Sequence, residues 1–154
     1  MSITFKAEKL AECIAEGANL LERQWGELAK HRDRIKLNYD LAAYARAEER
    51  GQLLICTARD DGRLVGYAVY FLAPHGHIHY VGTPWAESDI YWVEPEMRER
   101  GVGSALFRFV EQTLAGLGVT VMQTRTKDGH PAAEEMLFGM GHERTEAVWT
   151  KVLR

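Results

Sequence analysis

Residues 89–106 read DIYWVEPEMRERGVGSAL, and this stretch decides the fold that we predict for the chain. Its first residues are β-branched or aromatic, as in a strand, and Pro95 ends them. Gly101 and Gly103 then form a tight loop that opens a helix. A strand, a glycine loop and a helix in this order place unpaired backbone N–H groups and the positive end of the helix dipole at one point. Such a point suits a phosphate or a pyrophosphate.

The first half of the chain predicts a short strand, two helices and a hairpin. Apolar residues recur there at helical spacing, and Asp61-Gly62 is a strong signal for a hairpin turn. The expected elements are a strand at 3–6, a helix at about 8–30 with a break near Gly26, a helix capped by Asn38 and ended by Gly51, and hairpin strands at 53–59 and 64–72. The central sheet therefore starts at the hairpin.

The second half predicts alternating strands and helices. The expected elements are a segment at 77–81 that is either a strand or a loop, a strand at 86–94, a helix from residue 102 to about 117, a strand at 119–124, a short helix at 131–140 and a last strand at 147–153. This order makes a mixed α/β unit with a right-handed crossover. No repeat or linker divides the chain, so we predict a single domain over residues 1–154.

Composition and charge exclude several classes of protein. Hydrophobic residues make up 46% and charged residues 27% of the 154, as in an ordinary globular protein. The net charge of −3 predicts no nucleic-acid partner. Residues 30–36 are basic but are interrupted by Asp33, which favours a solvated connection, with a surface for an anionic partner as the alternative.

Cysteine usage and the lack of long apolar runs indicate where the protein works. Cys13 and Cys56 have neither disulfide nor metal-ligand spacing, so we expect free thiols in a reducing cytoplasm. The first residues lack an apolar signal segment, and the longest apolar run, 67–73, is too short to cross a bilayer. We therefore expect a cytoplasmic protein with no membrane partner.

The loop sequence fits the pattern Arg/Gln-x-x-Gly-x-Gly/Ala, from Arg98 to Gly103. Taken alone, these six residues are also compatible with an ordinary strand-to-helix turn that uses glycines. A Rossmann fingerprint needs Gly-x-Gly-x-x-Gly and a P-loop needs Gly-Lys-Ser/Thr, and neither spacing is present here.

The wider context resembles the GNAT acetyltransferase superfamily. The strand ends in Val93-x-Pro95, Arg98 follows three residues after the proline, and the flanking elements have the superfamily's order. The resemblance covers nearly the whole chain and is most specific over residues 87–106. It implies an α/β (α+β) fold whose mixed central sheet splays around acetyl-CoA, with helices on both faces. The chain also looks like small members of the superfamily carried by phages and prophages, which name no substrate.

The resemblance assigns roles in binding acetyl-CoA. It implies that the backbone of Trp92 and Val93 pairs with the pantetheine arm. It also implies a pyrophosphate site made of Arg98, Glu99, Arg100, Gly101, Val102, Gly103 and Ser104. At two positions where the family usually has an asparagine and a proton-donating tyrosine, this chain has His130 and Leu137. His130 can hydrogen-bond the pantetheine, but Leu137 cannot donate a proton, so Tyr91 or a water is the alternative donor.

Carboxylates on the same strand are the candidate general bases. Glu87 and Asp89 alternate with Ser88, so on a regular strand they share one face with Tyr91 and Val93. Glu87 matches the glutamate base of lysine-acetylating family members, so we rank Glu87 first and Asp89 second, acting directly or through a water. The alternative is that these carboxylates only attract a cationic amine.

Three histidines, His75, His77 and His79, recur at every second residue. On a strand this spacing would bring three imidazoles together, as a metal such as zinc requires. Pro74 and Gly76 argue against a regular strand, so we expect no metal and favour a lining of the acceptor pocket.

The function predicted from these residues is N-acetyl transfer from acetyl-CoA to a primary amine. We expect direct attack in a ternary complex, because neither cysteine matches a family nucleophile. The acceptor, a small molecule or a peptide, cannot be identified from the sequence. The alternative is a non-catalytic sensor or scaffold that binds acetyl-CoA, which the leucine at position 137 favours. A homodimer through the last strand or an exposed helix face fits the pattern, but nothing fixes it.

Overall fold

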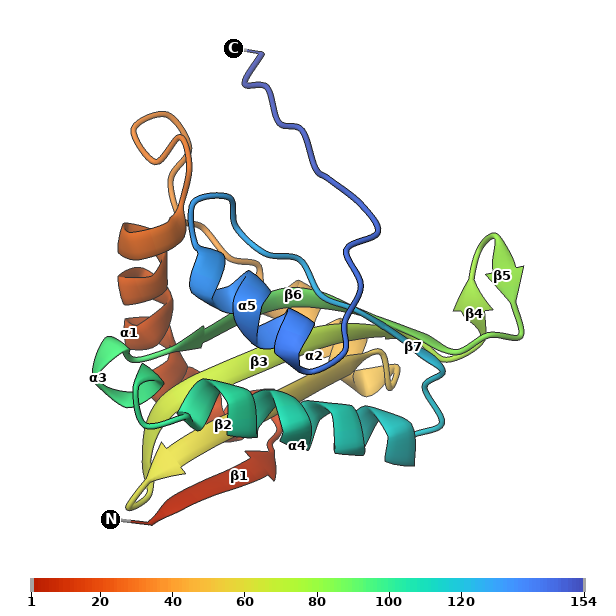
Figure 1. Cartoon of the computed structure of the whole chain (residues 1–154), viewed down its shortest axis with the longest axis horizontal. Coiled ribbons are helices and arrows are strands. Elements are labelled where there is room, and N and C mark those ends of the chain that lie inside the picture. Colours follow the sequence, from red (N-terminus) through yellow and green to blue (C-terminus); the bar gives the residue numbers. More distant parts are fainter. Residues whose placement is uncertain (1, 154) are drawn as a thin grey trace.

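A five-stranded mixed sheet forms the centre of the molecule in the computed structural model, which describes residues 2–153 (Figure 1). The strands in spatial order are β1 (Ile3–Ala7), β2 (Leu53–Asp60), β3 (Arg63–Ala73), β6 (Trp85–Val93) and β7 (Val121–Gln123). Neighbouring strands are antiparallel except β6 and β7, which are parallel. The prediction of a mixed α/β fold is confirmed.

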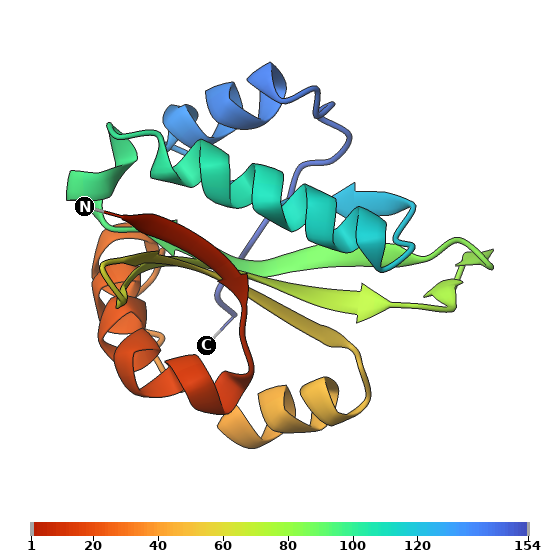
Figure 2. The ribbon, with the colours of Figure 1, turned by 90° about the horizontal axis from the view of Figure 1, so that it is seen from below.

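Helices cover both faces of this sheet (Figure 2). One face carries α1 (Leu10–Leu28) and α2 (Leu41–Glu49), and the other carries α4 (Val102–Gly116) and α5 (Pro131–Gly139). A four-residue helix, α3 (Pro95–Arg98), connects β6 to α4 and was not predicted. Pro95 suits its first turn, where a missing N–H costs nothing.

Side-chain alternation along β3 builds the two layers of the core. All seven residues from 64 to 70 are buried. Tyr67 and Val69 pack toward α1, while Ala68 and Tyr70 pack toward α4. A strand buried on both faces in this way reads as a continuous apolar run, which is why the hairpin could be recognised from sequence.

The parallel pair β6 and β7 stays together for only three residues on each strand. Trp85 to Glu87 lie opposite Val121 to Gln123, and beyond them the two segments diverge. From residue 88 to residue 93, one edge of β6 therefore has no neighbouring strand within residues 2–153. This gap is the splay that the sequence predicted.

Two details of the helices differ from the prediction. Helix α1 continues through Gly26 to Leu28 without a break, because packing of its apolar face outweighs the roughly 1 kcal/mol that a glycine costs in a helix. Helix α2 is capped by Asp40 and not by Asn38, since the Asp40 side chain accepts a hydrogen bond from the Ala43 N–H at 2.9 Å.

The predicted strand at 147–153 is absent. Residues 142–153 form an extended tail that has no strand partner in the described part of the chain and runs away from the body (Figure 1). His142 contacts Glu111 of α4 at 2.9 Å, and beyond it the tail is almost wholly exposed. A β-pattern forms a strand only when an edge is available for it, and this tail lies beside none.

A small hairpin of β4 (Gly76–His77) and β5 (Tyr80–Val81) projects past the end of the main sheet (Figure 1). A side chain at Gly76 would place its Cβ 2.3 Å from the Tyr80 carbonyl oxygen, and φ there is +95°, so the turn requires glycine.

Across residues 2–153, none of the helices is both long and apolar enough to cross a membrane.

Candidate active site

The splay between β6 and the segment after β7 forms the candidate site. Hydrogen bonds to the backbone of Arg125 cross it: the Arg125 N–H donates to Ser88 Oγ at 2.9 Å, and the Tyr91 hydroxyl donates to the Arg125 carbonyl at 3.0 Å. One wall is therefore the free edge of β6, and the opposite wall is the chain that leads to α5.

A β-bulge at Asp89 changes which side chains share a face of β6. Val69 lies opposite Ile90 and Tyr70 lies opposite Ser88, so Asp89 is an extra residue between them. The prediction that Glu87 and Asp89 share a face with Tyr91 and Val93 is therefore wrong. Glu87 and Asp89 face the α2 side, whereas Tyr91 and Val93 belong to the core layer of α4.

The backbone groups on the free edge of β6 are those of Tyr91 and Val93. The Val93 carbonyl accepts a hydrogen bond from Arg98 Nε at 2.8 Å, and the Tyr91 carbonyl accepts one from the Gln24 side chain at 3.4 Å. The Glu94 N–H donates to Val65 of β3 at 2.9 Å. Because backbone groups alternate between the two edges of a strand, those of Trp92 also face β3 and cannot pair with a ligand in the splay. This corrects the predicted pair of residues.

The glycine loop follows α3 and leads into α4. Gly101 is the N-cap of α4 and has φ of +73°, which glycine adopts without strain. The N–H groups of Val102, Gly103 and Ser104 occupy the first turn, where no intrahelical acceptor exists. A Cβ on Gly103 would approach only Met136 Sδ, at 3.8 Å. These three donors can hold an anionic group that approaches the end of the helix.

Arg98 is held on the far side of the loop by Glu27 of α1. Its terminal nitrogens lie 2.6 and 2.7 Å from the two Glu27 carboxylate oxygens. The indole N–H of Trp92 donates to Glu27 at 2.8 Å, and the guanidinium lies 5.5 Å from the Trp92 ring centroid. Hydrogen bonds from Arg98 lower the pKa of Glu27. The sequence analysis missed Glu27, because Glu27 lies 71 residues before Arg98 and no spacing within the loop motif points to it.

The other residues of the predicted pyrophosphate site surround this loop. Glu99 is the C-cap of α3 and is exposed. Arg100 lies 3.6 Å from Asp60 at the end of β2, and its guanidinium donates to Met97 Sδ at 3.2 Å. A role of these two side chains at a pyrophosphate stays a prediction.

The turn from β6 into α3 is fixed by a buried carboxylate. Glu94 has only 5% of its surface exposed, and it accepts hydrogen bonds from Arg23 of α1 at 2.7 Å and from Arg63 of β3 at 2.9 Å. Two arginines from different elements thus hold the end of β6 in place. This group positions the loop and does not face the splay.

The two candidate bases have different partners. Glu87 lies 3.1 Å from the Arg125 guanidinium across the splay. Asp89 accepts a short hydrogen bond from the Tyr44 hydroxyl of α2. Burial, and then this bond to Asp89, raise the pKa of Tyr44. Both carboxylates therefore lie beside the open edge of β6, held by residues that the sequence did not single out.

Tyr91 lies in the splay on the α4 side. Its ring meets Phe107 edge-on, with the ring centroids 5.0 Å apart, and its hydroxyl reaches the segment after β7. Burial raises the pKa of Tyr91 to about 12. The hydroxyl therefore stays protonated at neutral pH and can donate a proton.

His130 and Leu137 differ in their surroundings. His130 is the N-cap residue of α5 and contributes to the low pKa of Glu27, so it belongs to the neighbourhood of Arg98. Leu137 belongs to α5 and is its buried residue, with 6% of its surface exposed. An apolar residue suits that position, and it supplies no proton.

Neither cysteine can serve as a nucleophile at neutral pH. Burial raises the pKa of Cys13 to about 11 and that of Cys56 to about 12, so both remain thiols. They belong to the two core layers and do not line the splay.

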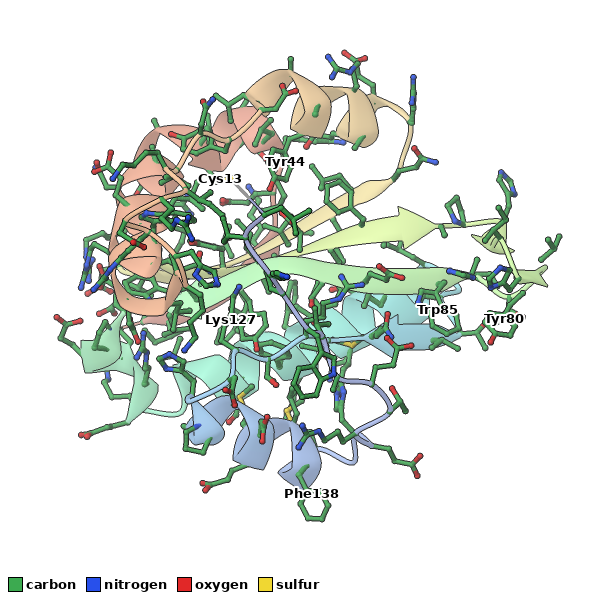
Figure 3. All side chains as sticks on the ribbon, turned by 90° about the horizontal axis from the view of Figure 1, so that it is seen from above. Cys13, Tyr44, Tyr80, Trp85, Lys127 and Phe138 are labelled. Atoms are coloured by element: carbon green, nitrogen blue, oxygen red, sulfur yellow. The ribbon has the colours of Figure 1, made fainter. Side chains whose placement is uncertain are left out.

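The histidines of the hairpin lie away from the splay. The His77 ring lies 5.6 Å from Tyr80 and 5.8 Å from Trp85, at the far end of the sheet (Figure 3). In the described part of the chain, no group of three metal-ligating side chains is arranged to hold an ion. The predicted lining of an acceptor pocket by these histidines remains untested.

A cavity of about 60 Å³ lies beside Asp89, between α1, α2 and the sheet. Figure 3 shows Cys13 and Tyr44 on this side of the sheet and Phe138 on the opposite side. Its lining is almost entirely apolar and includes Cys13, Gly17, Leu21, Tyr44, Tyr67 and Ile90. Two lining residues, Tyr44 and Ile90, are neighbours of Asp89, which is not itself part of the lining.

Comparisons with known proteins agree with this geometry. The model of the acetyltransferase (GNAT) family matches residues 15–140. None of the curated proteins matches the chain. Among solved structures, the chain is similar to AAC(6')-Iy in complex with a bisubstrate analogue, with 20% identity, coverage of 100% and 99% of the two chains and a TM-score of 0.73.

Two further structures have the same fold at lower identity. A ribosomal-protein-alanine N-acetyltransferase from Brucella melitensis biovar Abortus 2308 is 14% identical over 100% and 99% of the two chains, with a TM-score of 0.78. An aminoglycoside acetyltransferase from an uncultured soil metagenomic sample, in complex with sisomicin, is 10% identical over 99% and 97%, with a TM-score of 0.75. At these identities the likeness shows the fold and leaves the acceptor open.

Proposed function

Since the chain belongs to the GNAT acetyltransferase family, we propose that it transfers the acetyl group of acetyl-CoA to a primary amine by direct attack in a ternary complex. The observation that carries this proposal is the free edge of β6 followed, after the short helix α3, by the N-terminus of α4. One end offers unpaired strand groups and the other offers three helix N–H donors. An extended amide chain with a pyrophosphate at its end requires both.

The residues of the splay fit acetyl-CoA when it is bound. The Tyr91 and Val93 backbone groups would pair with the amides of the pantetheine arm, and the N–H groups of Val102, Gly103 and Ser104 would hold the pyrophosphate. The Gln24 and Arg98 side chains must first leave the two carbonyls. His130 would then lie near the arm.

The chemistry needs a neutral amine beside the thioester. A carboxylate on β6 removes one proton from the ammonium, the neutral amine nitrogen forms a bond to the acetyl carbon, and the bond from that carbon to sulfur breaks. The nitrogen of the new amide then loses its second proton, which restores the group that protonates the thiolate. We assign Glu87 as the first candidate base and Asp89 as the second, directly or through a water. Tyr91 or a water supplies the proton that the departing thiolate takes. The bulge turns Glu87 and Tyr91 to opposite faces of β6, which supports the proposal because a base and an acid there can reach different sides of the reacting centre.

Direct attack agrees with the state of the thiols. An acetyl-cysteine route needs an accessible thiolate, whereas both cysteines are buried and have raised pKa values. Holding the two substrates together can then supply much of the rate.

Two measurements test the proposal. Titration calorimetry should show binding of acetyl-CoA, and thiol release from acetyl-CoA should rise when a suitable primary amine is added. Failure to bind millimolar acetyl-CoA would overturn the proposal. A second candidate is a sensor that binds acetyl-CoA without turnover, favoured by the buried Leu137 at the usual tyrosine position. Binding without thiol release across a broad amine panel would support that candidate.

A further inference from the structure

A glycine inside α1 faces the cavity beside Asp89. Gly17 is buried in the middle of the helix, yet a Cβ built on it would meet nothing within 4 Å. Alanine would fit there and is a better helix former than glycine. Packing therefore does not explain this glycine. The empty volume that it leaves is continuous with the apolar cavity, whose lining includes Gly17 itself.

The cavity leads to one carboxylate. Tyr44 and Ile90 line it, and the Tyr44 hydroxyl donates to Asp89 at its border. Glu87, the neighbouring carboxylate on the same face of β6, is already paired with Arg125. Within residues 2–153, the Asp89 carboxylate accepts a hydrogen bond from Tyr44 but forms no ion pair, so a ligand that extends from this space toward the Tyr44 hydroxyl meets its negative charge beside an apolar recess.

This combination matches an amine with a single cationic group and a compact apolar body. The ammonium would pair with Asp89, and the apolar body would displace poorly hydrated space under α1. A polycationic acceptor needs several carboxylates, and an apolar recess offers its other charges no partner. The aromatic rings of Tyr44 and Tyr67 in the lining also suit a flat hydrocarbon group.

We infer that the acceptor is a primary amine carrying a compact apolar or aromatic group, seated between Gly17 and Ile90 with its nitrogen at Asp89. The inference rests on the proposed function and adds the class of its second substrate. It differs from what the aminoglycoside enzymes of similar fold bind, as their names describe.

The test compares acceptors in the native chain by thiol release. Phenethylamine and isoamylamine represent compact apolar amines, and kanamycin and spermidine represent polycations. The expected result is a kcat/KM at least tenfold higher for the apolar pair. A higher value for either polycation would overturn the inference while leaving the acetyltransferase proposal intact. Turnover of none of the amines, with acetyl-CoA still bound, would count against the proposed function itself.

A variant that fills the cavity tests the location. Gly17→Leu should raise the KM for phenethylamine at least tenfold, leave the KM for acetyl-CoA unchanged and keep or raise the melting temperature. Gly26→Leu is the matched control, since Gly26 is exposed on the same helix and also faces open space. If Gly17→Leu leaves phenethylamine kinetics unchanged, the cavity is a packing void and the inference is wrong.

Discussion

Glu27 and Arg98 form a two-pronged ion pair across the entrance to the glycine loop, with nitrogen–oxygen distances of 2.6 and 2.7 Å. The same arginine donates its Nε–H to the Val93 carbonyl, which lies on the free edge of β6. The two contacts hold the guanidinium against the strand edge that the pantetheine arm would use. In the proposed complex, acetyl-CoA competes with Glu27 for Arg98.

Replacing Glu27 by glutamine should strengthen binding of acetyl-CoA. The variant removes the charge that holds Arg98 but keeps an oxygen for the Trp92 indole N–H. A partly exposed pair of this kind is worth about 0.5–1 kcal/mol, so the dissociation constant should fall roughly two- to fivefold. Titration calorimetry measures the change, with Glu22→Gln on the exposed face of the same helix as control. An unchanged or weaker affinity would mean that Glu27 does not compete.

A negative charge at Gly103 should abolish acetyl-CoA binding. The structure has room for a side chain there, since only Met136 Sδ lies within 4 Å of a Cβ. Gly103→Glu should therefore fold normally but repel a pyrophosphate at the first turn of α4. The rise in melting temperature that acetyl-CoA produces should disappear in this variant. Gly116→Glu, at the other end of α4, is the control and should keep the rise in melting temperature. Loss of the rise in both variants would show that acetyl-CoA binding does not depend specifically on the glycine loop.

The order of elements could be predicted because each has a local signal. The Asp61-Gly62 turn, the alternation of β3 and the glycine loop are all determined within a few neighbouring residues. The tail pattern was misread because a strand also needs an edge, which local sequence does not describe. The cap at Asp40 shows the same limit at smaller scale, because both it and Asn38 are good capping residues.

The glycine loop could be predicted from the sequence more easily than the side chains around it. The glycine loop follows from residue types alone. The bulge at Asp89 adds one residue to β6 and turns Tyr91 to the other face, and nothing in the sequence marks that insertion. Glu27, Tyr44 and Arg125 come from distant segments, so only the fold shows that they hold the candidate groups.

The two carboxylates of β6 should differ in their kinetic roles. Glu87→Gln should lower kcat about a hundredfold with little change in the amine KM, as expected when a general base is lost. Asp89→Asn should mainly raise the amine KM, because it removes the counter-ion beside the cavity. Steady-state thiol release at saturating acetyl-CoA separates the two parameters. Equal effects of both variants on KM alone would show that the carboxylates only attract the amine.

Removing the Tyr91 hydroxyl should slow turnover without weakening acetyl-CoA binding. Tyr91→Phe keeps the ring against Phe107 and deletes only the group that donates to Arg125. Burial raises the pKa of Tyr91 to about 12, so the native hydroxyl is protonated throughout the working range and its loss should lower kcat about tenfold at every pH from 7 to 9. Tyr80→Phe on the projecting hairpin serves as control. A kcat equal to that of the native protein would assign the proton donor to water.

The charge of Glu16 should stabilise the fold only above the acidic range. The Leu64 N–H donates to its carboxylate at 2.9 Å and Arg59 lies 2.7 Å away, and these contacts lower its pKa below the ordinary value of 4.5. A depressed pKa gives stability that is complete above pH 4.5 and is lost as the pH falls through the folded-state value. Urea unfolding at several pH values should therefore show Glu16→Gln less stable than the native protein at pH 7, with the gap closing toward pH 3. Glutamine keeps an oxygen for the Leu64 N–H, so the closing difference in stability reports the loss of the Glu16 charge. A difference that stays constant over this range would show that the charge of Glu16, and with it the ion pair to Arg59, does not stabilise the fold.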